Sequence, residues 1–137
     1  MKPMRDDLMV QQQINMDRWK HMVSVMCLNL TYRKQVKRTL PKLFARYPDA
    51  KKFLRGHTKK QEQMLQELGL VTTRVARLRR MSKEYLSWDG VDAGDLHGIG
   101  KYGSDSYEIF FKNRIPRGVK DKELKKYIRR LKYSCKQ

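Results

Sequence analysis

The sequence predicts an all-α domain of about seven short helices. Apolar residues recur at the three- and four-residue spacing of a helix face, and the alternation that marks a strand is almost absent. The chain has 137 residues, of which 39% are apolar, which is enough for one hydrophobic core. We find no internal repeat, low-complexity segment or linker, so we interpret residues 1–137 as a single domain.

The first two helices are expected before residue 48. Residues 18–30 form the first, with Asp17 as its N-cap and an apolar face made of Trp19, Met22, Val23, Met26 and Leu30. Cys27 lies beside this face and is expected in the core. The second helix covers about residues 33–47, and Pro41 within it should kink or divide it.

The middle of the chain predicts three more helices. Pro48 breaks the chain and Asp49 caps a short helix. Residues 58–70 form a helix that ends at Gly69, since glycine suits the position after a helix C-terminus. A further helix runs from about Thr72 to Trp88, and Thr72 is its expected cap.

The last two helices carry most of the distinctive features. A glycine-containing turn precedes a helix that extends to about Lys112, after a loop at residues 89–95. Residues 113–120 form a second loop, with Pro and Gly. Asp121 then begins a basic helix, "KELKKYIRRLKY".

The charge and the cysteines limit the class of protein. Lys and Arg number 32 against 14 Asp and Glu, a formal net charge of +18, so we expect a polyanionic partner, most commonly nucleic acid. A basic protein without catalytic chemistry is the alternative.

Cys27 and Cys135 are interpreted as free thiols of a reducing compartment, and the lack of a Cys/His cluster argues against zinc or an iron–sulfur cluster. No apolar run approaches the ~20 residues of a membrane span and no signal peptide is recognisable, so we expect a nuclear, cytoplasmic or nucleoid protein that is not secreted.

The stretch "DLHGIGKYGSDSYEIF", residues 95–110, contains two glycines just before a helix. Gly98 and Gly100 would expose backbone N–H groups at the positive end of the helix dipole, which binds phosphate without reading sequence. Leu96 and Ile99 would anchor the turn in the core, and Lys101 would add a positive charge. A plain helix–turn–helix connection is the alternative interpretation.

The same stretch resembles the helix–hairpin–helix motif of DNA glycosylases, in particular the thymine/uracil mismatch glycosylase domains of methyl-CpG-binding proteins. Other segments match that family in order and spacing, namely "MVQQQINMDRWK", "LNLT", "YPDA", "LGL", "SKEYL" and "DKELKKY". The resemblance covers about residues 8–133. It leaves no room for a methyl-CpG-binding module, so we expect the catalytic domain alone.

The resemblance implies two catalytic residues. Asp121 matches the family's aspartate, which stabilises the oxocarbenium-like sugar and directs water, although capping a helix is the ordinary role of such an Asp. Tyr102 stands where superfamily members that also cut DNA carry a Schiff-base lysine, so no lyase activity is expected. The family pattern is altered nearby, since the loop before Asp121 is one residue shorter, Lys122 replaces His and Lys125 replaces Asn.

The remaining site residues are also implied by the resemblance. Gln11 matches a glutamine that reads the extruded pyrimidine. Leu30 replaces the family's wedge arginine in "LNLT", and Leu70 matches a second wedge position; core packing is the alternative for both leucines. A backbone-binding surface is expected from the basic residues Arg74, Arg77, Arg79, Arg80, Lys125, Lys126, Arg129 and Arg130.

Together these residues predict a monofunctional DNA glycosylase of base excision repair that removes thymine or uracil opposite guanine. We expect a monomer that binds double-stranded DNA, no membrane contact, no required cofactor or metal, and at most a monovalent cation at the hairpin. Two alternatives stay open. The same scaffold could act on a modified pyrimidine such as 5-hydroxymethyluracil or a hypermodified thymine, or the protein could bind DNA without catalysis.

Overall fold

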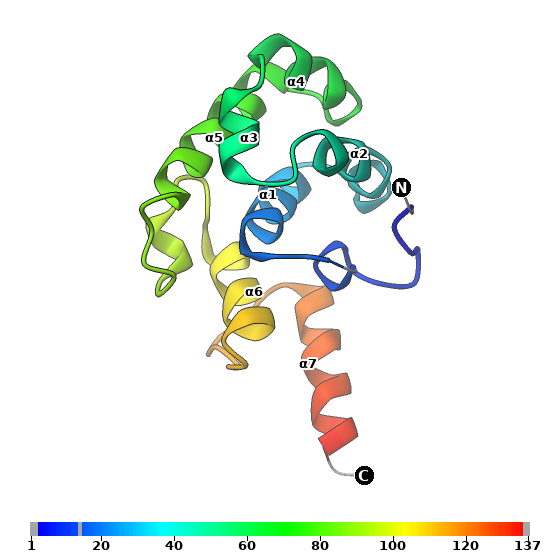
Figure 1. Ribbon diagram of the computed structural model, residues 1–137. Helices are drawn as coiled ribbons and strands as arrows, with labels where there is room; N and C mark the ends of the chain where they lie inside the picture. Colours follow the sequence, from blue (N-terminus) through cyan, green and yellow to red (C-terminus); the bar gives the residue numbers. More distant parts are fainter. Residues whose placement is uncertain (1–2, 14, 136–137) are drawn as a thin grey trace.

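In the computed structural model, which describes residues 3–13 and 15–135, the chain is helical and no strand occurs among these residues (Figure 1). The α-helices are α1 (Arg18–Leu28), α2 (Arg33–Arg46), α3 (Ala50–Arg55), α4 (Thr58–Met64), α5 (Val71–Tyr85), α6 (Lys101–Phe111) and α7 (Lys122–Cys135). Short 3-10 helices are η1 (Val10–Gln12), η2 (Gln66–Leu68) and η3 (Ala93–Asp95). The predicted all-α fold with a helix–hairpin–helix motif is confirmed, and the segment of the motif comprises η3, the turn at residues 96–100 and α6.

Helix α1 lies at the centre and contacts α2, α5 and α6 (Figure 1). Trp19, Met22 and Val23 are fully or almost fully buried, as the apolar pattern predicts, and Cys27 is buried beside them. Burial raises the pKa of the Cys27 thiol to about 12, so this thiol stays protonated and unreactive. The side chain of Cys135 lies outside the described part of the chain, so its expected free thiol stays a prediction.

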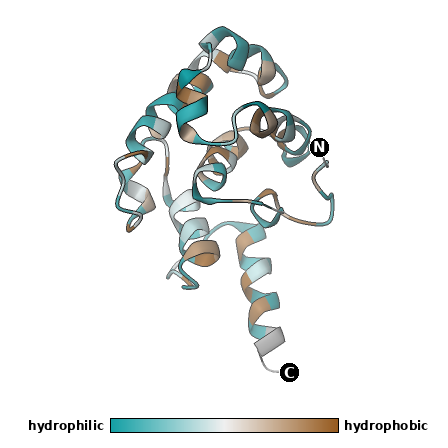
Figure 2. Ribbon diagram, in the orientation of Figure 1, coloured by the Kyte–Doolittle hydropathy of each residue, from teal (hydrophilic) through white to brown (hydrophobic). Residues whose placement is uncertain are grey.

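A second, smaller apolar cluster attaches α7. It contains Met9, Ile109, Leu124 and Ile128 and therefore joins the N-terminal segment, α6 and α7. Beyond its first turns, α7 extends away from the other helices (Figure 1). Hydrophobic and hydrophilic residues alternate along it (Figure 2). Because the anchoring residues lie in its first two turns, the cluster fixes the start of α7, where Asp121 stands.

The capping residues were predicted with mixed success. Asp17 and Asp49 each accept a hydrogen bond of 2.8 Å from a backbone N–H in the first turn of α1 and α3, as predicted. Thr72 is not a cap, because α5 begins at Val71 and is preceded by Leu70 in the left-handed conformation. The same helix ends at Tyr85 rather than Trp88.

Three other sequence-based expectations are corrected. Helix α1 ends at Leu28, so Leu30 is not part of its apolar face and is 83% exposed. Pro41 does not divide α2, since proline removes only one N–H and the flanking residues Leu40 and Leu43 are buried. The helix expected over residues 58–70 stops at Met64, and the chain turns to bury Leu65 and Leu68 before Gly69.

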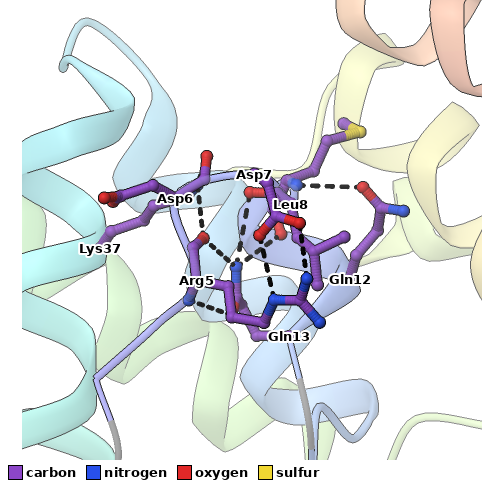
Figure 3. Close-up of polar contacts among 8 residues, drawn as sticks. Arg5, Asp6, Asp7, Leu8, Gln12, Gln13 and Lys37 are labelled. Carbon is purple, nitrogen blue, oxygen red and sulfur yellow. Dashed lines mark hydrogen bonds and ion pairs between the residues drawn. The ribbon is translucent and has the colours of Figure 1, made fainter.

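The N-terminal segment is held by one glutamine and one lysine (Figure 3). Gln13 Nε2 donates to the carbonyls of Arg5, Leu8 and Met9, and its Oε1 accepts from the Arg5 backbone N–H. Lys37 of α2 is 7% exposed and donates to the carbonyls of Arg5 and Asp6. These bonds fix the loop that carries η1.

The turn before α6 has the predicted anchors. Leu96 and Ile99 are buried, and the Ile99 N–H donates to the Leu96 carbonyl over 3.2 Å. Gly98 lies between them with φ of +81°, and a Cβ there would stand 2.6 Å from the Met26 methyl group. Gly100 precedes α6 with an ordinary negative φ of −93° and open space where a Cβ would be.

We therefore expect the two glycines to respond differently to alanine. Gly98→Ala should lower the free energy of unfolding by roughly 1 kcal/mol or more, because it forces a positive φ on alanine and displaces Met26. Gly100→Ala should change it by less than about 0.5 kcal/mol. Urea denaturation of both variants measures this, and equal losses would contradict the assigned geometry.

Candidate active site

Three predicted site residues that are far apart in the sequence line one cavity of about 480 Å³. Gln11 comes from η1, Tyr102 from the first turn of α6, and Asp121 from the residue before α7. The wall is completed by residues from the N-terminal segment, α1, the loop after α1, and the starts of α2 and α7, namely Met9, Val25, Leu28, Asn29, Leu30, Thr31, Arg33 and Glu123. The fold thus brings one carboxylate, one phenol and one amide to a shared space.

Asp121 both caps α7 and faces the cavity. One carboxylate oxygen accepts from the Leu124 N–H at 3.0 Å, the pattern of an N-cap. The side chain is half-buried, so the second oxygen remains available to the cavity. Capping and a role in the cavity are therefore compatible, because the helix terminus orients the carboxylate toward the cavity.

Tyr102 and Gln11 are joined by a hydrogen bond. Gln11 Nε2 donates to the Tyr102 hydroxyl and also to Ser106 Oγ at 3.2 Å. Burial raises the pKa of Tyr102 to about 12, and the carboxylates of Asp121 and Glu123 add to this increase. The phenol therefore keeps its hydrogen at neutral pH.

Sequence analysis did not identify the next two members of this hydrogen-bonded chain. Ser106 Oγ lies 3.0 Å from His21 Nε2, and both side chains are completely buried. Burial lowers the pKa of His21 to about 3, so the imidazole is neutral. The sequence does not distinguish a buried serine or histidine on a helix from one that faces solvent. Ser106 and His21 come together only because α1 packs against α6.

Leu30 and Leu70 project from two neighbouring loops. They are 83% and 66% exposed and have positive φ of 57° and 49°, a conformation that leucine rarely adopts. Both line a second cavity of about 210 Å³, and Leu30 also borders the larger one. The exposure rules out core packing as the explanation of either leucine.

Arg74 connects those two loops. Its guanidinium donates to the Gly69 carbonyl at 2.8 Å, to the Cys27 carbonyl at 3.4 Å and to the Thr31 hydroxyl. The loops that carry Leu70 and Leu30 are therefore held by one side chain from α5. The expected contact of Arg74 with a DNA phosphate stays a prediction, and in the free protein three of its five N–H groups are used internally.

The hairpin region presents an exposed backbone. Gly98 and Gly100 are exposed, and no side chain caps the N-terminus of α6. Lys101 does not extend freely: its ammonium pairs with Asp105 at 3.0 Å and lies 3.4 Å from the Arg117 carbonyl. The predicted phosphate contacts of these residues are not tested by the free protein.

Most of the remaining basic residues face solvent. Exposed side chains include Arg77, Arg80, Lys125, Lys126, Arg129 and Arg130. Arg79 differs, because its guanidinium donates to the carbonyls of Phe53, Leu54 and Gly56 and so holds the connection after α3. Within the described residues there is no group of three or more His, Cys, Asp or Glu side chains placed to hold a metal ion, and no helix there is long and apolar enough to span a membrane.

Comparisons with known proteins place this geometry in context. No family model matches the chain. The sequence is 35% identical over 94 residues to a methyl-CpG-binding domain protein 4-like protein of Arabidopsis thaliana, which is 69% of this chain and 21% of that protein. The chain therefore spans about a fifth of the length of this curated relative.

Solved structures share the fold. A thermostable thymine-DNA glycosylase superposes with a TM-score of 0.66 at 19% identity, over 72% of this chain and 48% of that one. Endonuclease III in a trapped covalent intermediate with DNA gives a TM-score of 0.62 at 14% identity, over 69% and 48%. A non-covalent complex of endonuclease III with DNA gives 0.62 at 13% identity over the same shares.

The buried imidazole predicts a pH-dependent stability. The unfolded chain protonates His21 near pH 6.5, whereas the native protein does so only near pH 3. The contribution of the neutral His21 to the free energy of unfolding is therefore complete above pH 7. Because the unfolded chain gains a proton at His21 below that pH, lowering the pH from 7 to 5 should reduce the free energy of unfolding by roughly 2 kcal/mol. Urea unfolding at several pH values measures the reduction.

His21→Leu should remove this part of the pH dependence, since leucine does not titrate. His57→Gln, at an exposed position, is the matched control and should retain it. An unchanged pH dependence in His21→Leu would mean that the imidazole is not buried in its neutral form.

Proposed function

Because this chain belongs to the helix–hairpin–helix DNA glycosylase superfamily, we propose that it is a monofunctional glycosylase that removes thymine or uracil mispaired with guanine. The observation that carries the proposal is the convergence of Gln11, Tyr102 and Asp121 on one cavity bordered by the exposed Leu30. A basic DNA-binding protein without catalysis would have no need for these groups to meet. The activity is the same class of reaction that the thymine-DNA glycosylase neighbour is named for.

Asp121 would supply the carboxylate that hydrolysis of a glycosidic bond needs. As the base leaves, positive charge develops on the sugar, and a fixed carboxylate at that point lowers the barrier. The free oxygen of Asp121 faces the cavity while its other oxygen is held by the Leu124 N–H. The same carboxylate can orient the attacking water, and no cofactor is needed for this step.

The target base must leave the duplex before it can enter the cavity. Leu30 and Leu70 are apolar, exposed and fixed, which suits side chains that fill the space left in the base stack. Leu30 borders both cavities. It would therefore stand between the flipped base on one side and the unpaired base of the opposite strand on the other. Since leucine replaces the family's arginine, it offers the partner base no hydrogen-bond donor.

The cavity wall supports a reaction without a lyase step. A lyase needs an amine that attacks the sugar carbon and forms an imine. Among the described residues no lysine lines this cavity, which contains Tyr102, and by its resemblance to the family Tyr102 would take the place of the Schiff-base lysine. Lys101, the nearest lysine in sequence, is paired with Asp105. The product would therefore be an intact strand with an abasic site.

Asp121→Asn tests the mechanism. Labelled duplexes with a single G·T, G·U, A·U or G·5-hydroxymethyluracil pair are incubated with protein and then divided, with hot alkali added to one half. We expect cleavage only after alkali, and a rate lower by a hundredfold or more in Asp121→Asn, because one fixed charge is lost. DNA binding should be retained, since asparagine also caps helices.

Asp49→Asn is the matched control, because Asp49 caps α3 in the same way but lies outside the cavity. Cleavage without alkali would contradict the monofunctional assignment. Release of the modified pyrimidine alone would redirect the proposal to that substrate, and salt-sensitive binding without any release would favour the non-catalytic alternative.

Leu30→Ala and Leu70→Ala test the wedge. Each should reduce the single-turnover rate on a G·U duplex by roughly tenfold, because less apolar surface supports the flipped state. Stability should change by less than about 0.5 kcal/mol, since both side chains are exposed. Leu86→Ala, an exposed leucine that lines neither cavity, is the control, and rates equal to the control would count against the wedge.

A further inference from the structure

Arg33 is the one positively charged residue that lines the larger cavity in the described part of the chain. It is the first residue of α2, shortly after Leu30. The same wall holds the carboxylates of Asp121 and Glu123. One guanidinium nitrogen of Arg33 lies 3.5 Å from a Glu123 carboxylate oxygen, so an ion pair joins the starts of α2 and α7. A reaction in this cavity therefore takes place beside one cation and two carboxylates.

Helix stability does not explain the position of Arg33. The dipole of a helix makes a cation at its N-terminus unfavourable. The first turn of α2 nevertheless starts with Arg33 and Lys34, contains no acidic residue and has no side-chain cap. The guanidinium and the helix terminus therefore both place positive potential at this part of the cavity wall.

The ion pair contributes little to holding α7 in place. The side chains of Arg33 and Glu123 are 48% and 41% exposed, and exposed pairs are weak. Glu123 also lies 3.8 Å from Lys126, so it is shared between two cations. The start of α7 is already fixed by the apolar contacts of Leu124 and Ile128. Because the contact with Glu123 involves one nitrogen of a group with five N–H donors, the guanidinium has donors left for a ligand in the cavity.

The positive charge of Arg33 extends to the side of the cavity where Tyr102 lies. Burial raises the pKa of Tyr102 to about 12, and the carboxylates of Asp121 and Glu123 add to this increase. The guanidinium of Arg33 opposes the increase in the pKa of Tyr102. A group that entered the cavity between these side chains would therefore be influenced by the same charges, which are screened less there than at an open surface.

We propose that Arg33 stabilises the negative charge that develops on the departing base, while Asp121 stabilises the positive charge on the sugar. This inference rests on the proposed function and adds a catalytic residue to it. When the bond between C1′ and N1 breaks, its electron pair stays on the base and spreads over N1 and the carbonyl oxygens. Water supplies the hydroxyl group that joins C1′ and the proton that the base anion finally takes up.

A cation is needed here because of the other charges in the wall. Without Arg33 the base anion would form beside the carboxylates of Asp121 and Glu123, with no positive side chain in the described wall of the cavity. Like charges at close range raise the energy of the transition state, in which the base already carries part of the negative charge. The amide of Gln11 and the protonated phenol of Tyr102 are neutral and do not offset the carboxylates.

The test varies the stability of the departing anion. Fluorine at the 5-position withdraws electrons, so 5-fluorouracil leaves as a more stable anion than uracil and depends less on a cation. The alkali assay measures single-turnover release from G·U and G·5-fluorouracil duplexes at saturating protein. We expect Arg33→Gln to slow uracil release about thirtyfold and 5-fluorouracil release only about threefold. Arg33→Lys retains a positive charge and should lose less than about threefold on uracil.

Glu123→Gln distinguishes a charge effect from a structural ion pair. The substitution removes the carboxylate that Arg33 offsets, so uracil release should become about threefold faster, and a rate at or above that of the wild type agrees with the inference. Release that is slowed in Glu123→Gln as much as in Arg33→Gln would mean that the pair only holds α2 and α7 together, which overturns the inference.

Arg38→Gln is the matched control, because Arg38 is an exposed arginine of the same helix that also pairs with a carboxylate, that of Glu67, but lies outside this cavity. Thermal denaturation checks that each variant is folded. Equal slowing of uracil and 5-fluorouracil release in Arg33→Gln, or no slowing, contradicts the role of Arg33 alone. Wild-type protein that releases neither base would overturn the proposed function and this inference with it.

Discussion

One chain of buried hydrogen bonds, from His21 through Ser106 and Gln11 to Tyr102, sets the geometry of the larger cavity. It joins α1, α6 and the N-terminal segment, which also pack together through apolar contacts. Buried polar groups that satisfy one another are directional, whereas apolar contacts tolerate small shifts. These hydrogen bonds therefore hold the Gln11 side chain against α6 before any base arrives.

That chain depends on a segment with little regular structure. Residues 5–13 have only one short 3-10 helix, and Gln13 with Lys37 supplies the bonds that a longer helix would make internally. Since Lys37 is almost completely buried, its ammonium is stabilised by backbone carbonyls of this segment. Loss of these bonds would displace Gln11 without altering any residue in the cavity.

The helices and their caps were predictable because they depend on local patterns: Asp17, Asp49 and Asp121 each precede a helix, and Trp19 begins an apolar face. The resemblance also indicated Gln11, Tyr102 and Asp121, which line one cavity. It could not indicate Ser106 or His21, whose roles arise only where α1 meets α6. Leu30 was misplaced on α1 because an apolar pattern does not distinguish a buried leucine from an exposed one.

Leu30 and Leu70 have a left-handed backbone conformation that leucine rarely adopts by itself, so the rest of the fold must stabilise it. Left-handed backbone is costly for leucine, so it persists only where other bonds fix the loops. Arg74 supplies such bonds to both loops at once, through the Gly69 carbonyl and the Thr31 hydroxyl. These bonds and the one to a backbone carbonyl near the end of α1 use three of the five N–H groups of the guanidinium. We infer that Arg74 serves the proposed DNA contact through the loops it fixes, and that the exposed arginines and lysines of α5 and α7 supply the charge that attracts the backbone.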